Sequence, residues 1–92
     1  MDAETFHAIR QAEDFPEEWA VIVIAHDGRR QYAAPGLTFT RFRGSSARFD
    51  GQAAALERAH MLRTMPRRYG SNQPAFPWIA DTEVELIKTR RR

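Results

Sequence analysis

The sequence predicts a small α+β domain in which an antiparallel sheet of about four strands carries two helices, in the order α-β-β-β-α-β. Three observations predict this class. Residues 18–26 form a run of apolar and β-branched side chains that is typical of a strand. Two turn signals follow closely, and apolar residues recur at helical spacing in two other segments. A length of 92 residues fits a single domain, 1–92, with a short basic tail at 90–92.

The first two elements are expected at residues 2–15 and 18–26. Asp2 can cap a helix whose apolar positions Phe6, Ile9 and Ala12 recur every three residues, and Pro16 ends it. The run EWAVIVIAH at 18–26 then reads as a strand that is apolar on both faces. We therefore expect it to be central in the sheet.

Two tight turns organise the next part of the chain. Asp27-Gly28 favours a hairpin that pairs 29–33 with the preceding strand. Pro35-Gly36 favours a second turn, after which the segment LTFTRFR at 37–43 has the composition of a third strand.

The rest of the chain predicts a loop, a helix, an exposed loop and a last strand. Residues 44–49 lack any period, and Asp50 is a good N-cap for a helix over 51–65 that buries Leu56, Ala59 and Leu62. Pro66 ends that helix. The turn-forming segment 67–74 is expected at the surface, and the alternating residues 79–88 are expected to form the fourth strand.

Charge is segregated along the sequence, although the formal net charge is only +2. Residues 1–27 hold seven acidic residues against one arginine, a net −6, and residues 28–80 hold nine arginines against two acidic residues, a net +7. Thirteen of the fourteen basic residues are arginine, whose planar fork suits phosphate contacts and stacking on rings. The basic middle is therefore the expected contact region for an anionic partner.

Catalytic and metal-binding patterns are not found in the sequence. The absence of cysteine excludes disulfides, thiolate zinc sites and cysteine nucleophiles, and the three histidines have no ligand spacing. No nucleophile elbow or phosphate-cradling glycine loop occurs. We expect a protein without enzymatic activity, cofactor, metal or small-molecule substrate. The longest apolar run, residues 19–25, is far short of the roughly 20 residues that cross a bilayer, so no membrane partner is expected.

Aromatic residues interleaved with arginines are the positive functional signal. Guanidinium groups can follow phosphates while ring faces stack on bases, as in proteins that hold single-stranded nucleic acid. Phe39 and Phe42 have a second interpretation as core residues of a strand, whereas residues 67–69 lie in a loop that has no core to fill. The candidate partner-binding residues are Arg29, Arg30, Tyr32, Arg41, Phe42, Arg43, Arg48, Phe49, Arg67, Arg68 and Tyr69.

The whole chain, and the stretch 14–50 (DFPEEWAVIVIAHDGRRQYAAPGLTFTRFRGSSARFD) above all, resembles phage-encoded anti-CRISPR proteins that act on type I-F systems. The resemblance implies an inhibitor in the cytoplasm of a bacterial host. It would bind an RNA-guided surveillance complex through Cas subunits and guide RNA, so that target DNA cannot hybridise. Acidic residues facing basic protein and arginines facing RNA would suit such a complex.

Two alternatives come from other classes. The order helix, three strands, helix also occurs in double-stranded-RNA-binding domains. Such domains are expected to carry lysines at the start of the second helix, whereas residues 51–56 contain no basic residue. The other alternative is a protein-interaction or homodimer module, which the two-sided apolar strand at 19–25 would serve if one face of the sheet lacked a covering helix. Binding of free RNA would favour the first, and binding only to an assembled complex would favour the inhibitor.

Overall fold

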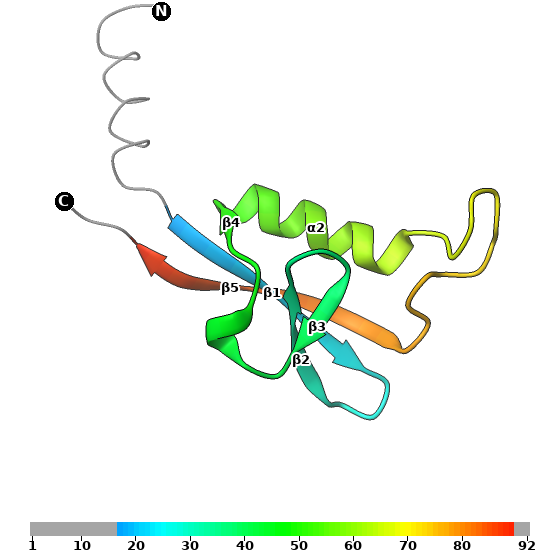
Figure 1. Ribbon diagram of the computed structural model, residues 1–92, viewed down its shortest axis with the longest axis horizontal. Helices are drawn as coiled ribbons and strands as arrows, with labels where there is room; N and C mark the ends of the chain where they lie inside the picture. Colours follow the sequence, from blue (N-terminus) through cyan, green and yellow to red (C-terminus); the bar gives the residue numbers. More distant parts are fainter. Residues whose placement is uncertain (1–16, 90–92) are drawn as a thin grey trace, which may run out of the picture.

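The computed structural model describes residues 17–89, in which one helix lies on one face of an antiparallel sheet (Figure 1). The α+β class and the antiparallel sheet are confirmed, but the sheet has five strands where about four were predicted, and an additional short strand precedes the helix, so the predicted order is not confirmed. The first predicted helix and the basic tail lie outside the described residues. The elements are β1 (Glu17–Ala25), β2 (Arg30–Ala34), β3 (Thr38–Thr40), the short 3₁₀ helix η1 (Arg43–Ser45), β4 (Phe49–Asp50), α2 (Gln52–Thr64) and β5 (Ile79–Thr89).

β1 is the central strand, as its two apolar faces predict. β5 pairs with it along its whole length on one edge, while β2 and β4 share the other edge. β3 pairs only with β2, at the outside of the sheet. Every one of these pairings is antiparallel.

Both predicted turns are present because each places a glycine where the backbone needs positive φ. Gly28 has φ of 88° in the β1–β2 turn, and Gly36 has φ of 74° after Pro35 in the β2–β3 turn. Glycine adopts such angles without the steric cost that a Cβ would bring. In the first turn the Asp27 carboxylate also accepts a hydrogen bond from the Arg29 backbone N–H at 3.0 Å.

The core lies between α2 and the face of β1 that carries Val21 and Val23. These two valines, Leu62 and Ala55 are at most 2% exposed. Small alanines on the helix allow its backbone to approach the sheet closely, so that branched residues of β1 fill the remaining space. Phe39, Phe49, Phe76 and Val84 pack at the margin of this core, half-buried.

Two of the three predicted buried residues of α2, Ala59 and Leu62, are confirmed, and the third prediction, Leu56, is wrong. Leu56 is 51% exposed, and Ala55 takes its place beneath the helix at 0%. Positions 55, 59 and 62 follow the i, i+4, i+7 spacing of one helix face, and Leu56 lies about 100° around the helix from Ala55, so it faces outward when that face is buried.

Three other predictions about element boundaries were wrong. The third strand covers only Thr38–Thr40, because the chain turns into η1 after Arg41 and Phe42. Asp50 is not the N-cap of α2: it belongs to β4, pairs with Glu18, and leaves the N-cap to Gly51, which makes no side-chain cap hydrogen bond. Residues 44–49, predicted to be only a loop, contribute part of η1 and the start of β4.

The face of β1 that points away from α2 is also buried. Ala20 is 0% exposed and Ile22 is 8% exposed, with Tyr32 and Glu83 beside Ile22 in register on the two neighbouring strands. No α-helix within residues 17–89 covers this face, as the homodimer alternative requires, but Ala20 and Ile22 themselves are buried there. Within the same residues, no helix is long and apolar enough to cross a membrane.

Candidate nucleic-acid interface

A network of charged and polar side chains crosses the sheet face opposite α2. Arg30 forms an ion pair with Glu83, and Arg43 Nε lies 3.4 Å from Glu85 Oε1. The Tyr32 hydroxyl donates a hydrogen bond to Glu85 Oε2 at 3.1 Å. Three predicted partner-binding residues, Arg30, Tyr32 and Arg43, are thus engaged in contacts between β5 and the β2 and η1 segments.

This network changes two pKa values in directions that the contacts explain. Partial burial raises the pKa of the Tyr32 phenol, and the hydrogen bond and negative charge of Glu85 raise it further. The hydrogen bond and charge of Glu83 raise the pKa of the Arg30 guanidinium above its ordinary value. Both groups are held in the protonated form by their carboxylate partners.

Arg48 and Phe49 also have structural contacts. Arg48 Nη2 donates to the Arg43 carbonyl at 3.3 Å, which helps to close the η1 segment. The half-buried Phe49 ring carries the Arg58 guanidinium at 5.6 Å from its centroid, a cation–π contact at the margin of the core. Phe49 therefore serves mainly the packing between β4 and α2.

The two interpretations of Phe39 and Phe42 separate in the structure. Phe39 makes edge-to-face contacts with Phe76 and Trp78, at centroid distances of 5.1 and 4.8 Å. Phe42 is 73% exposed, just before η1. Phe39 is part of the packing and Phe42 stays a candidate for partner contact.

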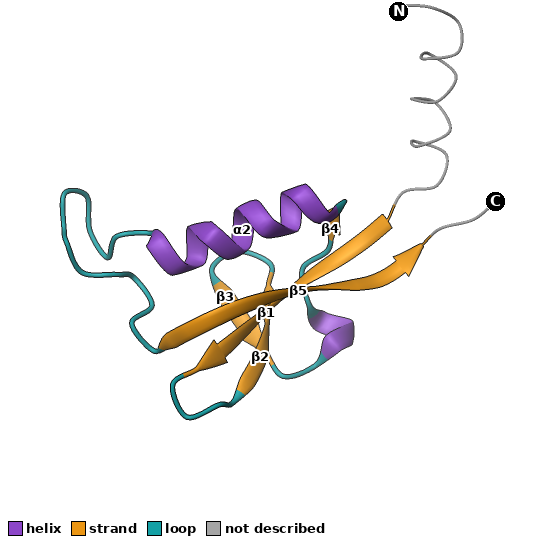
Figure 2. Cartoon of the chain, turned by 180° about the vertical axis from the view of Figure 1, so that it is seen from behind, coloured by secondary structure: helices purple, strands orange, loops and turns teal. Residues whose placement is uncertain are grey.

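The segment between α2 and β5 projects beyond the end of the helix, as the two opposite views show (Figures 1 and 2). It is closed like a hairpin by a Pro66–Pro74 bridge, by the Arg67 N–H donating to the Gln73 carbonyl and by the Ala75 N–H donating to the Met65 carbonyl, both at 2.8 Å. These bonds use backbone atoms alone. We call residues 66–74 the projecting loop.

The projecting loop presents the three residues that its sequence predicted to be exposed. Arg67, Arg68 and Tyr69 are all exposed, and Tyr69 is as accessible as in an extended peptide. Arg67 and Arg68 also line a hollow of about 280 Å³ together with Ser71 and Gln73. These three side chains pack against no part of the core, so packing does not explain why two arginines and a tyrosine stand together here.

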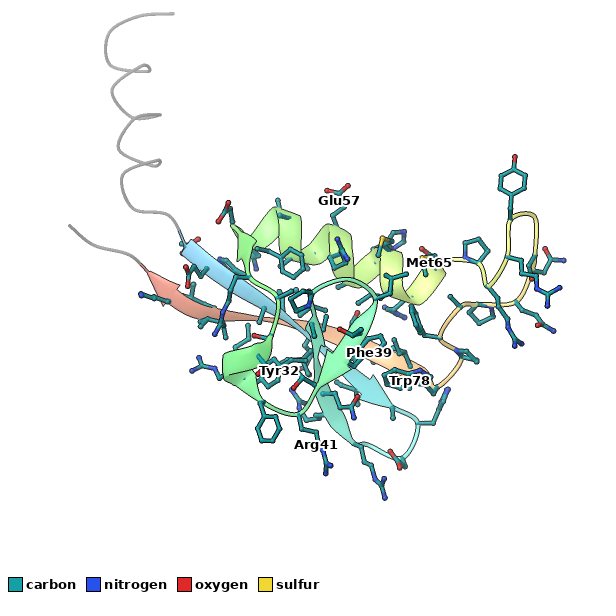
Figure 3. All side chains as sticks on the ribbon, viewed as in Figure 1. Tyr32, Phe39, Arg41, Glu57, Met65 and Trp78 are labelled. Carbon is teal, nitrogen blue, oxygen red and sulfur yellow. The ribbon has the colours of Figure 1, made fainter. Side chains whose placement is uncertain are left out.

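A second basic surface lies at the free end of the β1–β2 hairpin. Arg29, Arg30, Gln31 and Arg41 line a hollow of about 550 Å³ there. Arg29 Nε lies 3.2 Å from Asp27 Oδ2, which holds the side chain at the turn. Arg41 forms no ion pair within residues 17–89, and Figure 3 shows it extending outward at the edge of the sheet.

Sequence reasoning missed a neighbouring hollow that is built around Trp78. Its volume is about 330 Å³, and it is lined by Ala25, Asp27, Arg29, Gln31 and Trp78. Trp78 is 37% exposed and is held from one side by Phe39 (Figure 3). The available signal was a tryptophan directly after Phe76-Pro77, outside any periodic segment.

Folding pairs much of the basic middle of the chain with acidic residues from outside it. Arg29, Arg30, Arg43 and Arg63 have carboxylate partners at positions 27, 83, 85 and 81. Within residues 17–89, three arginines have no ion pair, hydrogen bond or ring contact through their side chains: Arg41, Arg67 and Arg68. Of the arginines in residues 17–89, those whose side chains make none of these contacts thus lie at the hairpin end and on the projecting loop.

The remaining candidate chemistry is sparse. Residues 17–89 contain no group of three or more side chains that could hold a metal ion. His26 is exposed, and its Nε2 lies 3.0 Å from the Pro77 carbonyl, a contact between the β1 end and the segment before β5. No protein family, curated protein or solved structure matches the chain.

Proposed function

We propose that this protein acts by binding, without catalysis, and that its partner is a nucleic acid or a nucleoprotein complex. The observation that carries the proposal is the position of the free arginines. Arg41, Arg67 and Arg68 are exposed and have no acidic partner in the described part of the chain, and exposed aromatic rings accompany them at positions 42, 69 and 78.

This combination matches the chemistry of a nucleic-acid backbone. A guanidinium forms two parallel hydrogen bonds with a phosphate, and each phosphate neutralised releases counterions, which makes binding favourable and salt-dependent. An exposed ring adds stacking with a base. The four arginines that already have carboxylate partners are less available for such contacts, because a phosphate would have to displace the carboxylate.

In the finer form of the proposal, the partner is a type I-F surveillance complex and the protein inhibits it. The support for this form is the sequence resemblance, together with the acidic residues near the start of the chain and the free arginines at the two basic surfaces. The arginines would contact guide RNA, and acidic residues would contact the positively charged protein channel in which guide and target strands lie. Target DNA could not then hybridise.

Size-exclusion chromatography tests the proposal directly. The protein is mixed with purified type I-F surveillance complex, before or after target DNA is added, and its elution is followed. We expect it to elute with the complex when it is added first and to reduce the amount of target DNA bound. Inhibition should be complete near a fixed molar ratio, since a binding inhibitor does not turn over.

The other outcomes identify the alternatives. Salt-dependent binding to free RNA with no preference for the complex would make the protein a stand-alone nucleic-acid-binding module. Inhibition at strongly substoichiometric amounts would contradict a non-enzymatic mechanism. Absence of binding to both the complex and free nucleic acid would refute the proposed function.

A further inference from the structure

The hollow beside Trp78 and the basic hollow at the hairpin end adjoin each other. They share Arg29 and Gln31 in their walls, so a single ligand can occupy both. The chain order explains the arrangement: β3 ends at Thr40, which pairs with Tyr32, and Arg41 follows directly and lines the basic hollow together with Gln31. An aromatic ring, an amide and two arginines therefore follow one another along this end of the sheet.

Each group in this row has a chemical role that it could take. Trp78 is held by its edge-to-face contact with Phe39 and stays 37% exposed in the wall of the hollow. A ring fixed in this way stacks on a flat ligand at small entropic cost. The half-buried Gln31 amide offers both a donor and an acceptor to the edge of such a ligand.

The two arginines are suited to an anion that follows the flat group. Arg29 is 87% exposed, and Asp27 contacts its Nε, which leaves both terminal nitrogens for another acceptor. Arg41 lies exposed in the same hollow and forms no ion pair within residues 17–89. A ligand with a planar aromatic unit and a phosphate on either side of it fits this order of groups, and that is the chemistry of a nucleotide chain.

We propose that the hollow beside Trp78 binds one base of a single-stranded nucleic acid, with the adjoining phosphates on Arg29 and Arg41. The inference rests on the proposed function and adds a specific site and ligand class to it. A volume of about 330 Å³ lies at the lower end of the roughly 300 to 1,000 Å³ of small-molecule sites. Duplex DNA cannot present an unstacked base there, so single strands are preferred.

Intrinsic fluorescence tests the site, because the chain has only two tryptophans. In the Trp19→Phe protein the emission comes from Trp78, and in the Trp78→Phe protein it comes from Trp19. Each is titrated with RNA or DNA single strands of about ten nucleotides, a length within the range covered by small single-strand-binding domains. We expect saturable quenching of Trp78 and none of Trp19, with RNA and DNA compared to show which backbone is preferred.

Affinity measurements on variants give a second, independent result. Trp78→Leu should weaken binding by about tenfold or more, because one base stack is lost. The combined Arg29→Ala and Arg41→Ala changes should reduce the slope of log affinity against log salt by about 1.4, at about 0.7 per phosphate contact of a single strand. Arg63→Ala removes one positive charge that pairs with Asp81 and lines neither hollow, and it serves as the control, with affinity within about twofold of the wild type.

Several outcomes would overturn the inference. One is binding of the nucleic-acid single strand without quenching of Trp78. This result would agree with the proposed function but would place the contact elsewhere, with the projecting loop as the first candidate. Another is equal quenching by an acidic peptide of similar charge, which would assign the hollow to a protein partner. If neither single strand binds, this site is refuted, and the proposed function is then decided by elution with the surveillance complex. The Trp19→Phe titration keeps the test valid even if Trp78→Leu fails to fold.

Discussion

The projecting loop offers the sharpest separation between folding and binding in this protein. Changing Arg67, Arg68 and Tyr69 together to alanine removes two positive charges and one aromatic ring from side chains that are exposed. The hydrogen bonds that hold the loop run between backbone atoms, from Arg67 to Gln73 and from Ser71 to Arg68, so alanine preserves them. Gly70, with φ of 78°, is also unchanged.

The expected magnitudes follow from this geometry. Surface substitutions without special backbone roles change the free energy of unfolding by less than about 0.5 kcal/mol each. For a domain of this size, 1 kcal/mol corresponds to roughly 4–8 °C. Three such changes can add up to at most about 1.5 kcal/mol, and because they can have either sign we expect a net shift in Tm of a few degrees and in no case more than about 12 °C. Truncating an arginine or tyrosine anchor commonly costs about 2 kcal/mol of binding, and we expect the triple variant to lose at least about tenfold in affinity, or about 1.4 kcal/mol.

The same preparations of the wild type and the triple variant are used for two measurements. One is thermal unfolding, and the other is binding to the surveillance complex or to the single strand that binds best. The matched control combines Arg63→Ala with Lys88→Ala, which removes two positive charges from α2 and β5 and leaves the loop intact. A folded triple variant that binds like the wild type would remove the projecting loop from the interface. A large fall in Tm would show that the loop contributes to folding, contrary to its exposure.

Three further predictions concern the core, the ionic network and the basic surface. Leu62 is 2% exposed, so Leu62→Ala should lower the free energy of unfolding, measured in urea titrations, by about 2–5 kcal/mol. Leu56→Ala, at an exposed position of the same helix, should change it by less than about 0.5 kcal/mol. Similar losses for the two variants would contradict the placement of α2. Because the pKa of Tyr32 is raised above its unfolded value of 10.0, the stabilisation it provides is complete below about pH 10 and is lost as pH rises through the folded-state pKa. Tyr32→Phe should therefore make unfolding stability fall less steeply above that pH, and identical pH profiles would refute the role of burial and Glu85. Arg41→Ala should weaken binding to nucleic acid and reduce its salt dependence without a change in Tm. Arg43→Ala, which loses the Glu85 contact, should weaken binding less. A larger loss of affinity in Arg43→Ala than in Arg41→Ala would contradict the assignment of Arg41 as free and Arg43 as paired.

The sequence predicted the parts of this fold that depend on local chemistry. The run of β-branched residues in β1, the glycines of the two turns and Pro66 after α2 all act within a few residues, so their consequences can be inferred without the rest of the chain. The exposure of residues 67–69 was predicted for the same reason, because turn-forming residues keep a segment at the surface.

Features that depend on the neighbours of each element could not be inferred in this way. The face of α2 that is buried is chosen by the shape of the sheet, which prefers Ala55 to Leu56 beneath the helix. The pairing of β4 with the start of β1 joins segments about thirty residues apart and competes with the local capping preference of Asp50. In both cases tertiary packing outweighed a local propensity.

The candidate site shows the same division. Composition and order determined that arginines and aromatic residues gather in the middle of the chain and that acidic residues lie on either side of it. Only the tertiary structure decided which arginines remain free, because β5 returns antiparallel to β1 and brings Glu83 and Glu85 within reach of Arg30 and Arg43. A count along the sequence gives the number of charged residues. Ion pairs form between residues that are close in space, so the strand order determines which of those charges are neutralised.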